Sequence, residues 1–354
     1  MRSYSGRDRI IAAFRRQYTD RVPVTLVLGP YSAKLAGVPL KVFLTKPDKL
    51  AESVVKAHEV LGPDSVVVYG DAYLEAEAVG SEIEFPEEAV THLKRHILEE
   101  KSTLAKLNIP DPKRDKRLPY YLEACERVTS VLKDPGIAGL LNGPWNIAVA
   151  LRGAQELIYD TMDDPDFVHE LMRFTTEVAK TFGDAQRETG VGVNVADAAA
   201  SCSLISPNIY AKFVKPYEEE LITYFKQKKA RVTIHICGYI DPIMEDLVAS
   251  GADAISIDGP SSLKKLVEVS QKKAVVIGNV PTELFVGGTK EQIEAAVKAC
   301  IETAADGSAY ILSSGCEIPY NASLETIKYF MNAGHQHGSE FISMLRESKP
   351  HLFE

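Results

Sequence analysis

Short runs rich in valine and isoleucine recur along the chain, and a stretch with helical spacing of its apolar residues follows each of them. The eight predicted strands lie at residues 22–28, 65–70, 138–143, 191–197, 231–238, 254–259, 274–279 and 308–315. Helices are predicted between them at 48–61, 147–159, 166–189, 207–228, 242–250, 262–271 and 290–304. Strands that alternate with helices are typical of parallel sheets with right-handed crossovers. We therefore expect an α/β fold, a (βα)8 TIM barrel, with a doubly wound open sheet as the alternative.

Two segments lie outside this repeat. Residues 6–17 predict an amphipathic helix within an N-terminal extension (1–20), with Ile10, Ile11 and Phe14 on the face that would cover the bottom of the barrel. Residues 72–119 contain charged helical stretches and a Pro/Lys/Asp run, and predict a helical insertion after the second strand. The 354 residues are expected to form one barrel domain over 1–354, because α/β barrels fill such lengths.

Charge and cysteine content exclude several classes of protein. With 40 Lys and Arg against 49 Asp and Glu, the net charge of −9 offers no basic surface for nucleic acid or an anionic membrane. No apolar run approaches the ~20 residues that span a bilayer. Five cysteines, an odd number spread widely, do not form a disulfide framework. We expect a soluble cytoplasmic enzyme, and formation of a homodimer is left open.

Three residues have the types and positions of a zinc site. His235 and Cys237 are two apart at the end of the fifth strand, so their side chains share a face. Cys316 directly follows the eighth strand and is expected at the same carboxyl rim, where barrel enzymes keep their active sites. One imidazole and two thiolates suit zinc, and three ligands leave a fourth position open for catalysis. The alternative is a set of ordinary buried core residues.

Further polar residues are predicted at the same rim. Asp71 follows the second strand and can act as an acid, a base or a cation partner, although a turn-forming role is the alternative. Asp197 and Asn279 end the fourth and seventh strands, and Trp145, the single tryptophan, opens the helix after the third strand. We place these last three residues near the cofactor-binding mouth, with Trp145 as a packing anchor. His335 and His337 near the C-terminus are expected in a solvated helix end rather than in a metal site.

Together with these residues, several segments resemble the uroporphyrinogen decarboxylase superfamily, and within it the zinc-dependent corrinoid methyltransferases. The methyltransferase branch is similar in its H-x-C pair and distant cysteine, matched here by His235, Cys237 and Cys316. This resemblance implies a (βα)8 barrel, a zinc ion and a corrinoid. The remaining segments mark the superfamily as a whole, and they lie at residues 9–14, 20–24, 69–71, 78–80, 143–145, 205–207, 214–217, 278–279 and 315–319.

The decarboxylase itself matches less well. Asp71 corresponds to its catalytic aspartate, but its arginine-rich loop is replaced by residues 28–34, which contain a single lysine. One lysine cannot replace several bidentate arginines in holding carboxylates. Ala148 stands where the decarboxylase has a tyrosine, and Cys316 stands where it has a histidine. Porphyrin decarboxylation through Asp71 is therefore kept as an alternative only.

The resemblance implies methyl transfer between a corrinoid and a small molecule. A zinc-held thiolate, of coenzyme M for example, would attack the methyl group of methyl-Co(III), giving a thioether and Co(I). In the reverse direction, Co(I) would take the methyl group from an aryl methyl ether or a methylated amine that zinc polarises. No segment resembles a corrinoid-binding domain, so a separate corrinoid-binding protein is the expected partner. Two alternatives are a zinc-bearing binding partner without turnover and a cobalamin-independent methionine-synthase-like enzyme.

Overall fold

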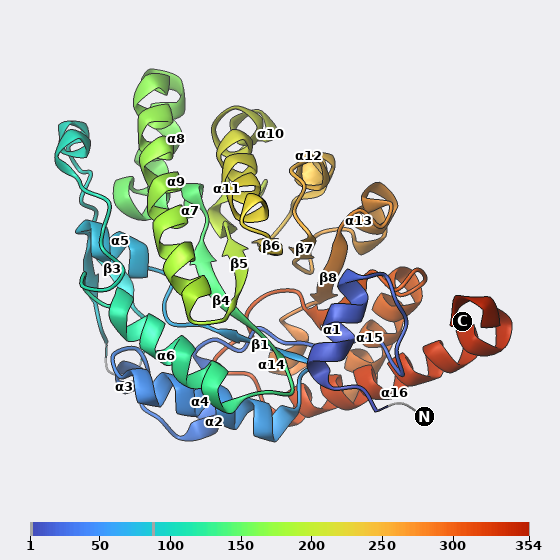
Figure 1. Ribbon diagram of the computed structural model, residues 1–354. Helices are drawn as coiled ribbons and strands as arrows, with labels where there is room; N and C mark the ends of the chain where they lie inside the picture. The colour runs from blue at the N-terminus through green and yellow to red at the C-terminus, as the bar shows by residue number, and fades with distance from the viewer. Residues whose placement is uncertain (1–2, 87–88, 354) are drawn as a thin grey trace.

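The computed structural model describes residues 3–86 and 89–353, and a curled sheet of seven parallel strands forms its centre (Figure 1). Every strand pairs with the next one in the order β1-β4-β5-β6-β7-β8-β9. This order excludes the doubly wound sheet and confirms the predicted TIM-barrel-like fold. The strands are β1 (Ser65–Val68), β4 (Gly136–Asn142), β5 (Gly192–Ala196), β6 (Val232–Ile236), β7 (Ala254–Ile257), β8 (Val275–Val280) and β9 (Tyr310–Ser314).

The first of the eight predicted strands, 22–28, does not form as a strand. It makes isolated bridges to the last strand region, Val24 with Leu312 and Val27 with Glu317. On its other side, the Asp64 amide donates to the Val24 carbonyl at 2.8 Å, and side chains make the remaining contacts: the Val24 amide donates to the Asp64 carboxylate at 2.8 Å, and the Thr25 hydroxyl donates to the Ser65 carbonyl at 3.0 Å. Pro23 also has no N–H to donate. The segment still closes the barrel, because it connects β9 to β1.

Helices surround the sheet, as Figure 1 shows for α6, α9, α11 and α15. Within residues 3–86 and 89–353, no helix is long and apolar enough to cross a bilayer. The helix predicted over 147–159 is two helices, because the chain turns at Gly153 with φ +93°. The described helices are α1 (Gly6–Phe14), α2 (Tyr31–Ala36), α3 (Leu40–Phe43), α4 (Pro47–Leu61), α5 (Leu74–Val79), α6 (Leu118–Val131), α7 (Pro144–Arg152), α8 (Ala154–Asp163), α9 (Pro165–Glu188), α10 (Pro207–Ile209), α11 (Lys215–Gln227), α12 (Met244–Ala249), α13 (Leu263–Ser270), α14 (Leu284–Gly287), α15 (Lys290–Ala304) and α16 (Leu324–Ser348).

The insertion after β1 is not simply helical. It contains α5, an antiparallel pair of strands, β2 (Glu82–Glu84) and β3 (His92–Arg95), and a 3-10 turn at Lys101–Lys106. Residues 87 and 88 of the predicted helical stretch lie outside the described part. The physical reason for strands is an alternation of period two: Ile83 and Leu93 face one another and are partly buried, whereas their neighbours are exposed. One domain over 1–354 stays a prediction.

Helix α1 (Gly6–Phe14) lies against the N-terminal ends of the barrel strands. Ser5 caps it by accepting from the Asp8 amide at 3.1 Å. Ile10 and Phe14 pack on a small cluster of buried residues that contains Val275 and Ile311. The helix therefore covers part of the barrel end that is opposite the carboxyl rim.

Candidate metal centre

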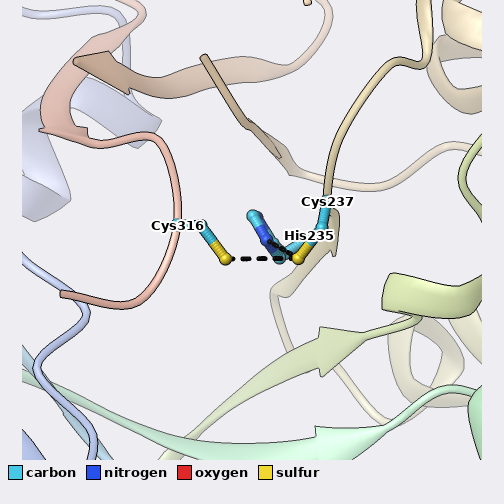
Figure 2. Close-up of side chains that lie close together, drawn as sticks. All are labelled: His235, Cys237 and Cys316. Atoms are coloured by element: carbon cyan, nitrogen blue, oxygen red, sulfur yellow. Dashed lines mark hydrogen bonds between the residues drawn. The ribbon is translucent and has the colours of Figure 1, made fainter. Parts of the chain in front are cut away.

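The three predicted metal ligands meet at the carboxyl rim of the barrel. His235 lies in β6, Cys237 directly follows that strand, and Cys316 comes from the loop after β9. Figure 2 shows the three side chains pointing toward one another. His235 Nε2 is 3.1 Å from Cys237 Sγ, which is 3.2 Å from Cys316 Sγ, and all three ligand atoms lie within 4.8 Å of one another. Two neighbouring segments and one distant segment thus form a compact donor set.

This donor set fits zinc. Bonds of about 2.0–2.3 Å in a tetrahedron place ligand atoms roughly 3.3–3.8 Å apart. The observed separations of 3.1 and 3.2 Å are slightly shorter, so the side chains need to spread by only a few tenths of an ångström. All three residues are half-buried and line a cavity. A metal held here would have one side open to a small molecule.

Contacts within the cluster shift the pKa values of its three side chains in different directions. The hydrogen bond between the two thiols raises the pKa of Cys237 and lowers the pKa of Cys316 to about 4. Burial disfavours the imidazolium of His235, but the hydrogen bond to Cys316 and the charge on its sulfur outweigh burial and raise the pKa of His235. The thiolate is the form of cysteine that binds metals, and the lowered pKa of Cys316 favours this form.

Two residues of β7 and its following loop support the ligands. Ser256 Oγ lies 3.0 Å from His235 Nδ1, and the Asp258 carboxylate accepts from the Gly238 amide at 2.9 Å. The first contact orients the imidazole, and the second holds the loop that begins at Cys237. Sequence reasoning missed both residues. The signal for Asp258 was present, because it stands near the end of the strand predicted at 254–259, just as Asp197 ends another.

A carboxyl group lines the cavity next to the cluster. Burial raises the pKa of Glu317 to about 7, although its hydrogen bond with Tyr69 acts in the opposite direction. Gly29, at φ +48°, makes room for this group, because a Cβ there would be 2.7 Å from the Glu317 carboxyl carbon. Tyr69 and Glu317 therefore form part of the wall beside Cys316.

The cavity has a volume of about 710 Å³, which is enough for a small-molecule substrate. Its rim end is lined by the three ligand residues, by Tyr69 and by Glu317. From there it continues down the inside of the barrel as far as α1. The candidate metal centre is thus reached through an enclosed space rather than from a flat surface.

Asp71 is buried and does not line this cavity. Its carboxylate forms an ion pair with Arg117 at 2.7 Å and accepts from the Thr91 hydroxyl at 2.6 Å and from the Tyr73 amide at 3.1 Å. All three partners belong to the insertion after β1. The structure therefore places Asp71 where it ties the insertion to the barrel.

The other predicted rim residues lie behind the cavity wall. Asp197 accepts from the Asn146 amide at 2.6 Å and from the Trp145 amide at 3.3 Å, at the N-terminus of α7. Trp145 is fully buried. Asn279 donates to the Asp258 carbonyl at 3.1 Å, so it holds the loop after β7. None of these three residues lines the cavity, whereas Asn146 does.

The two histidines near the C-terminus lie within α16, away from its ends. His337 Nδ1 is 3.0 Å from the Glu340 carboxylate. His335 is half-buried, and its Nε2 has no hydrogen-bond partner among the described residues. Neither belongs to the cluster of metal-binding residues.

Fold and site together define the class: an α/β barrel enzyme with a candidate metal centre at the carboxyl end of its strands. The model of the family Uroporphyrinogen decarboxylase (URO-D) matches residues 5–337, and the chain belongs to this family. The chain is 24% identical over 334 residues to "Methylcobamide:CoM methyltransferase MtbA" of Methanosarcina mazei, covering 90% of this chain and 94% of that protein.

A solved structure described as a methyltransferase from Methanosarcina mazei superposes with a TM-score of 0.86 at 25% identity, covering 94% of this chain and 99% of that one. The chain is also 25% identical over 347 residues to "Uroporphyrinogen decarboxylase" of Myxococcus xanthus, covering 94% and 97% of the two chains. Relatives of both names therefore match at similar identity. The choice between the two activities must come from the site.

Proposed function

We propose that this protein is a zinc-containing methyltransferase that moves a methyl group between a corrinoid on a partner protein and a small-molecule substrate. The observation that supports it best is the meeting of His235, Cys237 and Cys316 at the end of an enclosed cavity. These side chains would hold the zinc ion, which supplies an open coordination position for a sulfur or oxygen atom of the substrate.

The chain's own residues account for the rest of the site. Ser256 fixes the imidazole of His235, so that Nε2 faces the two sulfur atoms. Asp258 holds the Gly238 amide, which limits the movement of the neighbouring Cys237. The barrel wall surrounds the cavity and would position the substrate beside the reacting atoms. Positioning of this kind is a major source of rate enhancement in transfer reactions.

We infer that the substrate is a thiol, coenzyme M being one example, and that its sulfur receives the methyl group. A set of one nitrogen and two sulfur ligands suits a site that holds a further thiolate. Relatives named for methylcobamide and coenzyme M support this direction. The alternative within the same site is demethylation of an aryl methyl ether or a methylated amine, with Co(I) as the acceptor.

A corrinoid-binding protein is part of this proposal, because both directions need a corrinoid at the barrel mouth. A cytoplasmic location and a homodimer belong to it as expectations from the sequence. The competing decarboxylase assignment is supported by the family and by the Myxococcus relative. The position of Asp71 weighs against it, because that carboxylate faces Arg117 rather than the cavity.

The first test is the zinc content of the purified chain, prepared without chelators. About one zinc per chain is expected in the wild type. Cys237→Ala should lose it, and Cys202→Ala should keep it, because Cys202 is partly exposed but lies outside the cluster. A wild-type protein that contains no zinc would contradict the proposal.

The second test follows demethylation of methylcobalamin in the presence of thiols. Cys316→Ala should keep the circular dichroism spectrum of the wild type, because this half-buried loop residue contributes little to the core. Its rate should fall by more than about 100-fold, since loss of a metal ligand exceeds the effect of losing a supporting hydrogen bond. A rate independent of both zinc and Cys316 would favour the decarboxylase assignment instead.

A further inference from the structure

The cavity lined by His235, Cys237 and Cys316, the candidate metal-binding cluster, extends through the barrel to its opposite end. At the carboxyl rim it is lined by His235 and Cys316, and at the other end by Phe14 of α1 and by Arg231. Arg231 and His235 are four residues apart on one extended segment, which places the two ends about 13 Å from each other. One continuous space thus connects the cluster with the N-terminal end of the strands.

The inside of this barrel is not filled in the usual way. In TIM barrels, layers of bulky branched side chains normally pack the interior. Here Ala138, Asn194 and Thr233 line the interior and remain partly exposed. The Thr233 hydroxyl and the Asn194 amide can bind water, whereas the Thr25 and Ser65 hydroxyls contact each other at 2.8 Å and Ser256 contacts His235. Small or polar residues that line it include Thr25, Ser65, Ala138, Asn194, Thr233 and Ser256.

The N-terminal end of the cavity is open and basic. Arg7, Lys133 and Arg231 line it and are exposed, and the described lining contains no carboxylate other than Glu317 at the rim end. Two carboxylates are near this end: Asp64 is paired with Arg9 and Arg21, and exposed Asp134, which follows Lys133, accepts from the Gly6 amide at 3.3 Å. The three lining cations are therefore not neutralised by the lining itself.

Glycines leave this end without side chains that could close it. Gly136, Gly190 and Gly192 all line the cavity there. Gly192 is exposed, and a Cβ at this position would meet no atom closer than the Ile137 carbonyl oxygen at 3.5 Å. Gly192 shares the inward face of β5 with Asn194, so a larger side chain at 192 would project into the opening.

We propose that the N-terminal end of the barrel is a second entrance to the metal-binding cluster of His235, Cys237 and Cys316, and that small anionic molecules pass through it. Its three cations attract anions, and the hydroxyl and amide groups within the mainly apolar lining offer them hydrogen bonds on the way to His235 and the two cysteines. Only the identity of the molecule, an anionic thiol, rests on the proposed function. A partner protein on the carboxyl rim would cover that mouth, and the thiol would still reach the cluster from the opposite side.

The test measures how fast Cys237 and Cys316 are alkylated by iodoacetate, an anion, and by iodoacetamide, its neutral analogue. The full-length chain is reduced and treated with a chelator, and the modified peptides are separated from those of Cys202 by mass spectrometry. In Arg7→Glu/Arg231→Glu, the ratio of the iodoacetate rate to the iodoacetamide rate should fall at least about five-fold. Lys298→Glu/Lys290→Glu, an equal charge change on exposed lysines of α15, should leave the ratio unchanged.

A second pair of variants tests the route itself. Gly192→Phe should slow both reagents by blocking the N-terminal end, whereas Ala198→Phe, on the lining near the carboxyl rim, should slow iodoacetate less. An unchanged reagent ratio in the double arginine variant would overturn the proposal, and so would unchanged rates in a folded Gly192→Phe variant. If Gly192→Phe does not fold, the ratio of the two alkylation rates in the Arg7→Glu/Arg231→Glu variant tests the proposal by itself.

This measurement is independent of the proposed activity. It requires neither bound zinc nor methyl transfer, so a chain without zinc would contradict the proposed function and leave the alkylation rates interpretable. Conversely, equal alkylation rates in all variants would contradict the second entrance, and they would not contradict the proposed zinc-containing methyltransferase.

Discussion

At the scale of single residues, the orientation of the His235 imidazole depends on Ser256, because only one of the two ring nitrogens can face the sulfur atoms. Ser256 occupies the other nitrogen at 3.0 Å. Ser256→Ala should weaken zinc binding about 10–100-fold, since the imidazole loses its orientation. Competition with a fluorescent zinc chelator measures this change.

A matched control is Ser314→Ala. Ser314 is also a buried strand serine, but its hydroxyl has no hydrogen-bond partner among the described residues. Its removal should leave zinc affinity within about two-fold of the wild type. Equal affinities for Ser256→Ala and Ser314→Ala would show that the imidazole is held by its packing alone.

The meeting of the three candidate ligand residues could be predicted because two simple rules place them: alternation along a strand and the carboxyl rim of a barrel. The same rim rule selected Asp71, yet its side chain meets Arg117 rather than the cavity. Arg117 is distant in the sequence, and no local pattern reports that contact. Position along a strand could be predicted, but the partner of a side chain could not.

At the scale of elements, Arg117 joins the end of β1 to the insertion and to α6. It pairs with Asp71 at 2.7 Å and with Glu77 at 2.6 Å, and all three side chains are largely buried. Arg117→Met leaves two carboxylates without their cation, so we expect a loss of about 3–5 kcal/mol in the free energy of unfolding. Urea denaturation measures it, with exposed Arg114→Met as the control.

Asp71→Asn tests the same contact from the other side. The double variant Asp71→Asn/Arg117→Met should be more stable than Arg117→Met alone, because one unpaired buried charge is then absent. Its methyl-transfer rate should stay within about ten-fold of the wild type if Asp71 has a structural role. A stable Asp71→Asn variant with no activity would instead identify Asp71 as catalytic.

Strand and helix positions followed from apolar periodicity, and α15 was predicted at its observed bounds. Segments whose hydrogen bonds come from side chains could not be assigned in this way. Residues 22–28 look like a strand by composition, but they form only isolated bridges, and the Asp64 and Thr25 side chains make part of the bonds toward β1. The pair β2–β3 was hidden by charged residues that are also common in helices.

At the scale of the whole molecule, acid should loosen the packing of α16 through His335. Burial, followed by the nearby charge of Arg21, lowers the pKa of His335 to about 4, whereas an unfolded histidine has a pKa of about 6.5. The unfolded state thus binds more protons between these values. The contribution of His335 to stability is full above pH ~6.5 and is lost as the pH falls toward 4.

Because His335 is only half-buried, we expect this loss to be about 1–2 kcal/mol in the free energy of unfolding. Urea denaturation at pH 7 and pH 5 should show a smaller decrease for His335→Gln than for the wild type. His337→Gln, on the same helix beside Glu340, is the control and should behave like the wild type. Identical decreases in all three proteins would exclude His335 as the titrating group.

The bridge between Val24 and Leu312 joins the two ends of the barrel wall, although most of the chain lies between them in the sequence. Closing so long a loop costs entropy that is regained only when the final strand is in place. During synthesis, which adds roughly 5–20 residues per second, the edge of residues 22–28 that faces β9 would therefore stay unpaired until β9 had left the ribosome. In that interval, the unpaired edge would be accessible to chaperones that bind exposed strands.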